Sequence, residues 1–194
     1  MQVENICVYC ASSSQVKPEY FDAAEKLGKI IAQNNLRLIY GGGQRGLMGK
    51  IADSALMEGG KVTGIIPGFM CEVEWNHNGL TELILVESMH ERKEMLAKMA
   101  DAVVALPGGC GTMEELLEVI TWKRLGLFTK PIIICNIAGY FNPLIEMLNR
   151  SVDENFMREQ HRGMWVVVDS PELVMKAIDT STLWNENAKD FAAL

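Results

Sequence analysis

Short apolar runs alternate along this chain with longer segments in which apolar side chains recur at helical spacing. The runs have the length and composition of buried strands. They cover residues 6–9, 36–40, 61–66, 82–86, 102–105, 131–135 and 164–168. Strands that alternate with helices indicate a parallel sheet with right-handed crossovers and helices on both faces. The pattern therefore predicts an α/β fold: a mostly parallel, doubly wound sheet in a single domain over residues 1–180, followed by a C-terminal tail over 181–194.

Capping residues mark where several of the intervening helices begin. Pro18 suits the first turn of a helix that runs to about residue 34. Ser88 and Glu91 have the spacing of a capping box, so another helix is expected to begin at Ser88. Ser170-Pro171-Glu172 has the composition of a helix start and predicts a closing helix. Further helices are expected over residues 47–58, 116–125 and 139–153, and the polar stretch 67–81 is expected to form a lid or pocket wall.

Two glycine-rich turns each follow an expected strand and lead into an expected helix. One is Gly41-Gly42-Gly43-Gln44-Arg45-Gly46; the other is Leu106-Pro107-Gly108-Gly109-Cys110-Gly111. A bare backbone at a helix start presents N–H groups and the positive end of the helix dipole to one point. We therefore expect a phosphate-binding cradle at the carboxyl ends of the strands, where ligands bind in such sheets. The first strand ends in the small residues 10–14, which leave room for a ligand to approach.

Charged residues accompany these turns, and each allows two interpretations. Arg92 and Lys93 fall near the start of a helix, where the dipole disfavours positive charge. They are either solvated surface cations or partners of a bound anion, and the neighbouring cradle favours the anion. Thr112 and Glu115 fit a capping box, so Glu115 is either a helix cap or a functional carboxylate. In a first helical turn its charged form would be favoured, so Glu115 is expected to be ionised and a poor general acid.

Composition excludes several classes of function. A net charge of -7 argues against nucleic acid as a partner, because that binding needs clustered Lys and Arg. No segment approaches the roughly 18 apolar residues of a membrane span, and no secretory signal opens the chain. Five scattered cysteines fit a reducing cytoplasm, and three histidines without ligand spacing predict no metal site. Cys7 and Cys10 form a C-x-x-C motif within a strand, where they are expected to point to opposite faces.

No cofactor is expected. A dinucleotide fold needs an acidic residue for the ribose at the end of the strand after its glycine turn. Here that strand, residues 61–66, ends in Pro67-Gly68 without a carboxylate. A pyridoxal-phosphate decarboxylase would need a buried Schiff-base lysine. The only lysine near the cradle, Lys93, lies beside Arg92.

Four motifs together resemble one family. They are Tyr40-Gly41-Gly42-Gly43, Gly46-Leu47-Met48-Gly49, Met89-His90-Glu91-Arg92-Lys93 and Pro107-Gly108-Gly109-Cys110-Gly111-Thr112-Met113-Glu114-Glu115. The chain resembles the LOG ("Lonely Guy") family of cytokinin riboside 5'-monophosphate phosphoribohydrolases, often mislabelled as lysine decarboxylases. The resemblance extends from about residue 5 to 178. It implies a Rossmann-like homodimer that cleaves the N-glycosidic bond of an adenine-type nucleoside 5'-monophosphate into free base and ribose 5-phosphate.

The resemblance also implies site residues. Arg92 and Glu115 match the catalytic pair. The residues that match or neighbour the substrate-binding segments are Gly41, Gly42, Gly43, Glu74, Lys93, Gly108, Gly109, Cys110, Gly111, Thr112, Met113, Glu114 and Thr121. Thr121 follows Glu115 by about 600° of helix, so the two are not expected to share a face. Ala11 stands where the family commonly has glycine, and its methyl group could crowd the phosphate.

The chemistry fits these residue types. Loss of the base leaves an oxocarbenium-like sugar. An adjacent carboxylate such as Glu115 either stabilises this positive charge or activates the attacking water. Arg92 would hold the phosphate or orient the substrate. Two alternatives stay open: a non-catalytic nucleotide-binding or carrier protein on the same scaffold, and a base other than adenine.

Overall fold

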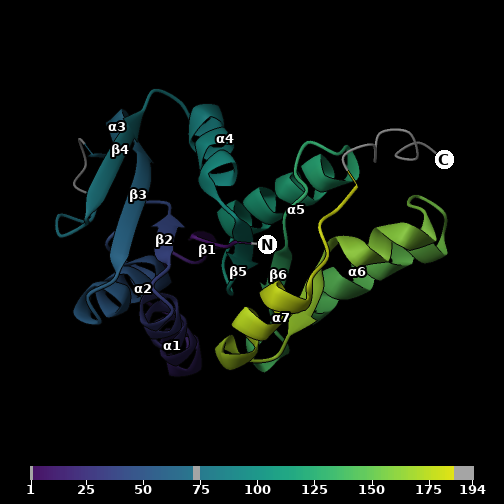
Figure 1. Ribbon diagram of the computed structural model, residues 1–194, viewed down its shortest axis with the longest axis horizontal. Helices are drawn as coiled ribbons and strands as arrows, with labels where there is room; N and C mark the ends of the chain where they lie inside the picture. Colours follow the sequence, from purple (N-terminus) through teal and green to yellow (C-terminus); the bar gives the residue numbers. More distant parts are fainter. Residues whose placement is uncertain (1, 72–74, 186–194) are drawn as a thin grey trace.

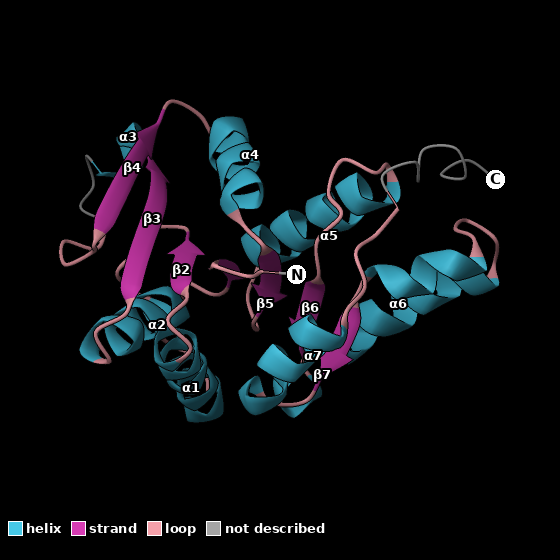
Figure 2. Cartoon of the chain, viewed as in Figure 1, coloured by secondary structure: helices cyan, strands magenta, loops and turns pink. Residues whose placement is uncertain are grey.

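Seven parallel strands form one sheet in the computed structural model, which describes residues 2–71 and 75–185. Their order across the sheet is β4-β3-β2-β1-β5-β6-β7, and every neighbouring pair is parallel (Figures 1 and 2). The strands are β1 (Asn5–Tyr9), β2 (Arg37–Tyr40), β3 (Lys61–Pro67), β4 (Glu82–Val86), β5 (Ala102–Ala105), β6 (Ile132–Cys135) and β7 (Val166–Val168). The predicted α/β fold with a doubly wound, Rossmann-like sheet is confirmed.

Helices connect these strands and cover both faces of the sheet. They are α1 (Pro18–Gln33), α2 (Gly46–Met57), α3 (Gly68–Cys71), α4 (Met89–Met99), α5 (Cys110–Arg124), α6 (Asn142–Asp153) and α7 (Val174–Thr180). Short 3-10 helices are η1 (Ile137–Gly139), η2 (Glu159–Met164) and η3 (Pro171–Leu173). Within the described ranges, no helix combines the length and hydropathy needed to cross a bilayer.

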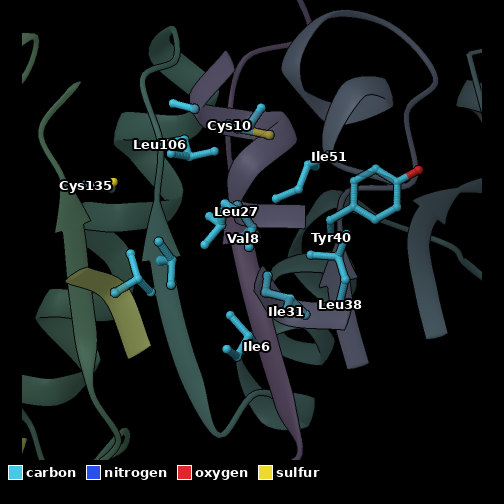
Figure 3. Close-up of a cluster of buried hydrophobic side chains, with 14 of the residues drawn as sticks. Ile6, Val8, Cys10, Leu27, Ile31, Leu38, Tyr40, Ile51, Leu106 and Cys135 are labelled. Atoms are coloured by element: carbon cyan, nitrogen blue, oxygen red, sulfur yellow. The ribbon is translucent and has the colours of Figure 1, made fainter. Parts of the chain in front are cut away.

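Alternation along the strands divides the core into two clusters. In β1, Ile6 and Val8 pack with side chains of α1, α2 and α7. The close-up of this cluster shows Val8 beside Leu27 of α1 (Figure 3). Cys7 and Tyr9 pack on the opposite face with side chains of α4, α5 and α6. Because Cys10 belongs to the first cluster and Cys7 to the second, the prediction that this pair points to opposite faces is confirmed.

The order of the strands places a crevice beside β1. The chain builds β1 to β4 outward toward one edge, and α4 then carries it back across the sheet to β5, on the other side of β1 (Figure 1). Ala11 N donates to Pro107 O over 3.2 Å, which joins the loops that leave β1 and β5. This is the topological switch point at which open α/β sheets bind ligands.

Several predicted boundaries were wrong for local reasons. Helix α6 begins at Asn142 rather than 139, because Ala138 (φ 52°) and Gly139 (φ 71°) adopt left-handed backbone conformations that an α-helix does not accept. Strand β7 begins at Val166 because η2 continues to Met164. Helix α3 lies within the polar stretch 67–81, for which no helix was predicted.

Leu27 offers a test of this packing. It is completely buried on α1, so Leu27→Ala is expected to lower the free energy of unfolding by about 2–5 kcal/mol through lost burial and a residual cavity. Met57 on α2 is 83% exposed, and Met57→Ala is expected to change that free energy by less than about 0.5 kcal/mol. Chemical denaturation of both variants measures the difference; equal losses would contradict the placement of α1.

Candidate functional site

A pocket of about 540 Å³ opens at the carboxyl ends of the strands. It is bounded by the loops after β1, β2 and β3 and by the N-terminal ends of α2, α4 and α5. The lining residues are Cys10, Ala11, Ser12, Gly41, Gly43, Arg45, Met48, Ile66, Met70, Trp75, Met89, Arg92, Gly109, Cys110, Gly111, Thr112 and Glu115. The two glycine-rich turns recognised in the sequence thus meet in one cavity.

The turn after β2 is held from two sides. The buried Tyr40 donates its hydroxyl hydrogen to Gly43 O over 3.1 Å. Gly42 has a φ of 77°, which favours glycine, and its carbonyl accepts from His77 N over 2.9 Å. Gln44 N donates to Trp75 O over 3.1 Å, so this part of the loop after β3 lies against the turn. Met70 and Trp75 consequently form one wall of the pocket, as expected of the 67–81 stretch.

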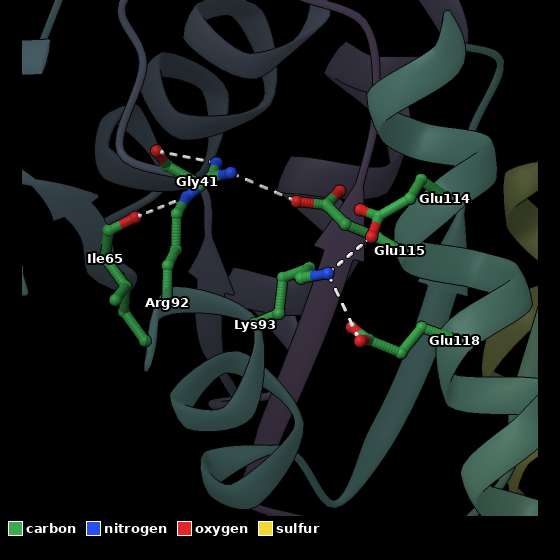
Figure 4. A network of polar contacts seen from close by, with 7 residues as sticks. All are labelled: Gly41, Ile65, Arg92, Lys93, Glu114, Glu115 and Glu118. Atoms are coloured by element: carbon green, nitrogen blue, oxygen red, sulfur yellow. Dashed lines mark hydrogen bonds and ion pairs between the residues drawn. The ribbon is translucent and has the colours of Figure 1, made fainter. Parts of the chain in front are cut away.

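Arg92 is buried at the centre of the site and uses all three guanidinium nitrogens (Figure 4). Its Nε donates to Ile65 O over 3.0 Å, and its Nη2 donates to Gly41 O over 3.2 Å. Its Nη1 donates to Glu115 Oε1 over 3.2 Å. A Cβ at position 41 would lie 2.0 Å from Nη2, so only glycine leaves room for this guanidinium.

Glu115 faces the pocket, but its predicted ionisation was wrong. Helix α5 begins at Cys110 with Gly109 as a cap that makes no side-chain bond, so the expected Thr112–Glu115 capping box does not form. Glu115 therefore lies beyond the first turn. Burial raises its pKa from 4.5 to about 7, and the charges of Glu114 and Glu118 act in the same direction. Arg92 and Lys93 lower the pKa without offsetting burial.

Lys93 points away from the pocket and is neutralised by two carboxylates (Figure 4). Its Nζ donates to Glu114, and it donates to Glu118 Oε1 over 3.2 Å. The bond from Glu114 raises the pKa of the lysine, whereas a Schiff-base nucleophile needs a neutral amine. Arg92 and Lys93 thus both have protein partners on α5, so their position near the start of α4 does not by itself indicate a bound anion.

The start of α4 confirms another prediction. Ser88 caps the helix by accepting from Glu91 N at 3.1 Å, and Glu91 Oε2 accepts from Glu87 N at 2.8 Å. This capped start holds Arg92 and Lys93 in adjacent positions on α4. Because successive helical residues point in different directions, Arg92 reaches the pocket while Lys93 reaches the flank of α5.

The glycine cradle is the start of α5. Gly109, Cys110 and Gly111 are exposed and line the pocket, and the first N–H groups of a helix have no intrahelical partner. The preceding carbonyl, Gly108 O, accepts from the Tyr140 hydroxyl over 2.6 Å, which ties the cradle to the loop after β6. A 15-residue helix with this exposed start is suited to bind an anion.

The structure brings together eight of the residues singled out in the sequence. Gly41, Gly43, Arg92, Gly109, Cys110, Gly111, Thr112 and Glu115 line the pocket. Gly42, Lys93, Gly108, Met113, Glu114 and Thr121 do not line it. Thr121 is exposed and donates to Leu117 O within its own helix, on a different face from Glu115, as its spacing predicted. Glu74 lies outside the described residues.

The lining also contains residues that were not among the predicted site residues. Arg45, Met48, Ile66, Met70, Trp75 and Met89 belong to this group. Arg45 lies within the first glycine-rich turn, so the sequence pattern gave a reason to include it in the predicted site. Trp75 reaches the pocket only through tertiary contacts of its loop. Ala11 lines the pocket and is buried.

This geometry defines a class of protein: a Rossmann-like α/β protein whose switch-point pocket combines a helix-start anion cradle with a buried carboxylate. Comparison with known proteins identifies the family. The family model described as "Possible lysine decarboxylase" matches residues 48–178.

Two plant relatives from Arabidopsis thaliana carry the name cytokinin riboside 5'-monophosphate phosphoribohydrolase. LOG7 is 42% identical over 168 residues, which cover 87% of this chain and 76% of that protein. LOG1 is 40% identical over 183 residues, which cover 92% of this chain and 86% of that protein. The chain therefore belongs to the LOG family.

Solved structures share the fold at lower identity. The molybdenum cofactor carrier protein of Chlamydomonas reinhardtii matches with a TM-score of 0.71 and 21% identity, over 92% of this chain and 97% of that one. The molybdenum cofactor binding protein of Rippkaea orientalis matches with a TM-score of 0.70 and 20% identity, over 93% and 98%. These likenesses concern the fold alone.

The raised pKa of Glu115 predicts how stability changes with pH. Between about pH 4.5 and 7 the folded state keeps a proton on Glu115 that the unfolded state releases, so rising pH favours unfolding. Relative to Glu115→Gln, the wild type is expected to lose on the order of 3 kcal/mol of unfolding free energy across this range, at about 1.4 kcal/mol per pKa unit. Denaturant unfolding at several pH values measures the difference. A wild type that instead gains stability with pH would indicate an ordinary or lowered pKa.

Proposed function

We propose that this chain hydrolyses the N-glycosidic bond of an adenine-type nucleoside 5'-monophosphate and releases the free base and ribose 5-phosphate. The observation that carries the proposal is the placement of Glu115, a buried carboxylate that faces the same pocket as the exposed start of α5. The plant relatives' printed names describe this class of reaction on cytokinin riboside 5'-monophosphates. A cytokinin nucleotide is accordingly one candidate substrate.

The cradle would bind the 5'-phosphate. Phosphate oxygens would accept hydrogen bonds from backbone N–H groups at Gly109, Cys110 and Gly111, and the dipole of α5 would favour their charge. Binding energy at this remote group would hold the scissile bond in position. Met48, Met70, Met89 and Trp75 would supply apolar surface for the planar base.

Glu115 would act on the sugar. As the C1'–N bond breaks, positive charge develops on the ribose, and the ionised carboxylate stabilises it. A water molecule then adds to C1', and the same carboxylate takes up one of its protons. The base leaves with the electron pair of the broken bond and receives a proton from solvent, to which Glu115 returns the proton that it took up. A pKa of about 7 suits this exchange, because the group gains and loses a proton near neutral pH.

Arg92 would position Glu115. Two of its donors are fixed by Gly41 O and Ile65 O, so the third holds the carboxylate in one orientation. Arg92 also lines the pocket, so its remaining guanidinium hydrogens would be available to substrate oxygens.

We also propose a homodimer in a reducing compartment such as the cytoplasm. The surface for the dimer lies at the outer face and the end of α5, where the exposed leucines Leu117, Leu125 and Leu127 form an apolar area of the kind that subunit interfaces use.

The proposed reducing compartment rests on the cysteines. All five lie within the described residues as free thiols, as is usual for proteins of such compartments.

The dimer can be tested by sedimentation. We expect a mass of twice 21.6 kDa for the wild type. Replacing Leu117 and Leu125 by Lys is expected to shift the protein toward monomer, because unpaired charges would then be buried in the interface. A wild type that sediments as a monomer at micromolar concentration would reject the proposal.

Turnover of Glu115→Gln tests the reaction. Incubation with AMP followed by chromatography of adenine is expected to show a loss on the order of 100-fold or more in kcat, with nucleotide binding retained, because the charge-stabilising group is gone. Glu146→Gln is the matched control: it makes the same change at an exposed position on α6, outside the pocket, and should keep turnover within a few-fold.

The same assay separates the alternatives. Near-normal turnover in Glu115→Gln would show that the residue is not catalytic. A wild type that binds AMP and releases no base would favour the non-catalytic nucleotide-binding or carrier protein. A panel of purine and pyrimidine 5'-monophosphates would define the base.

A further inference from the structure

Arg45 lies at the N-terminal end of α2. It is the N-cap residue of that helix, and its exposed side chain lines the pocket. The next residue, Gly46, has a φ of 61°, and a Cβ there would lie 2.5 Å from the backbone carbonyl carbon of Ser12. Met48 N donates to Ala11 O over 3.2 Å. These contacts hold the backbone of Arg45 beside the loop after β1, which is itself bonded to the loop that precedes the cradle.

The charges of the pocket single out this arginine. Of the described residues that line it, three are charged: Arg45, Arg92 and Glu115. All three guanidinium nitrogens of Arg92 already donate to protein acceptors, one of them to Glu115. The guanidinium of Arg45, by contrast, forms no ion pair or hydrogen bond with any residue in ranges 2–71 and 75–185. Of the two cations in the described lining, Arg45 is therefore the one whose guanidinium donors are all available to a ligand.

The helix dipole disfavours Arg45 slightly, and a bound anion would reverse that effect. A cation at a helix N-terminus opposes the dipole, and the first turn of α2 carries no acidic side chain to compensate. The starts of both α2 and α5 open on the same pocket. An anion in that pocket would interact favourably with both dipoles and with the guanidinium.

We propose that Arg45 is a specificity-determining residue that binds the 5'-phosphate of the substrate opposite the α5 cradle. The proposal rests on the hydrolysis proposed above and explains how the site would distinguish a nucleoside 5'-monophosphate from the free nucleoside. A guanidinium binds two phosphate oxygens at once, which adds geometric selectivity to charge attraction. The same contact holds the ribose 5-phosphate product, so Arg45 also sets the strength of product inhibition.

Binding of ribose 5-phosphate tests this assignment without requiring turnover. Calorimetric titration of Arg45→Ala is expected to show affinity about 10- to 100-fold below the wild type, the range for hydrogen bonds to a charged group. Affinity for adenosine should stay within about twofold, because adenosine lacks the phosphate. Arg45→Lys should recover part of the loss, since it keeps the charge without the bidentate geometry.

Kinetics and a surface control complete the experiment. Arg45→Ala should raise KM for AMP with kcat within a few-fold of the wild type, the pattern of a lost binding contact. Arg150→Ala removes the same charge from an exposed position on α6 and should leave both ligands unaffected. Melting temperatures of the variants verify that each is folded.

The outcomes separate this proposal from the proposed reaction. Unchanged ribose 5-phosphate binding in Arg45→Ala, or equal losses for adenosine and ribose 5-phosphate, would overturn the role of Arg45 even if the wild type releases adenine. Arg45-dependent binding of ribose 5-phosphate in a wild type that leaves AMP intact would support the role of Arg45 and reject the hydrolase.

Discussion

The guanidinium of Arg92 is the interaction on which the candidate site depends. A buried cation is costly unless its hydrogens find acceptors. Here the acceptors come from three different segments: Gly41 after β2, Ile65 within β3 and Glu115 on α5. Since Arg92 itself lies on α4, one side chain connects the carboxyl-terminal edge of the sheet to two helices. The bare backbone at Gly41 is a condition of that arrangement, because a side chain there would occupy the place of the guanidinium.

Burial raises the pKa of Glu115, whereas the neighbouring cations lower it, and burial has the larger effect. Arg92 and Lys93 favour its ionised form, whereas desolvation and two neighbouring carboxylates disfavour it, and the resulting pKa is about 7. A carboxyl group balanced in this way changes its protonation state readily at neutral pH. Glu114 and Glu118 have a second role, because they bind Lys93 on the flank of α5 and keep it out of the pocket. Lys93 is therefore part of the support of the site and not of its lining.

The fold alone does not decide what this pocket does. Proteins named for binding or carrying a molybdenum cofactor share the architecture at about one-fifth identity, and a shared fold does not by itself define a ligand. Function depends on which side chains stand at the strand ends. In this chain they are the Arg92–Glu115 pair, the α5 cradle and an arginine at the start of α2. Membership of the LOG family and this constellation both lead to the phosphoribohydrolase proposal.

The sequence by itself determined the alternation of strands and helices, the two glycine turns and the capped start of α4 at Ser88. These features depend on side-chain periodicity and turn chemistry within a few residues, so local reasoning reaches them. Only the tertiary structure decided the partners of Lys93, the direction of the pKa shift of Glu115 and the presence of Trp75 in the pocket. Burial and ion pairing are set by residues distant in the chain: Arg92 and Gly41 are 51 positions apart, and no local pattern records that they meet.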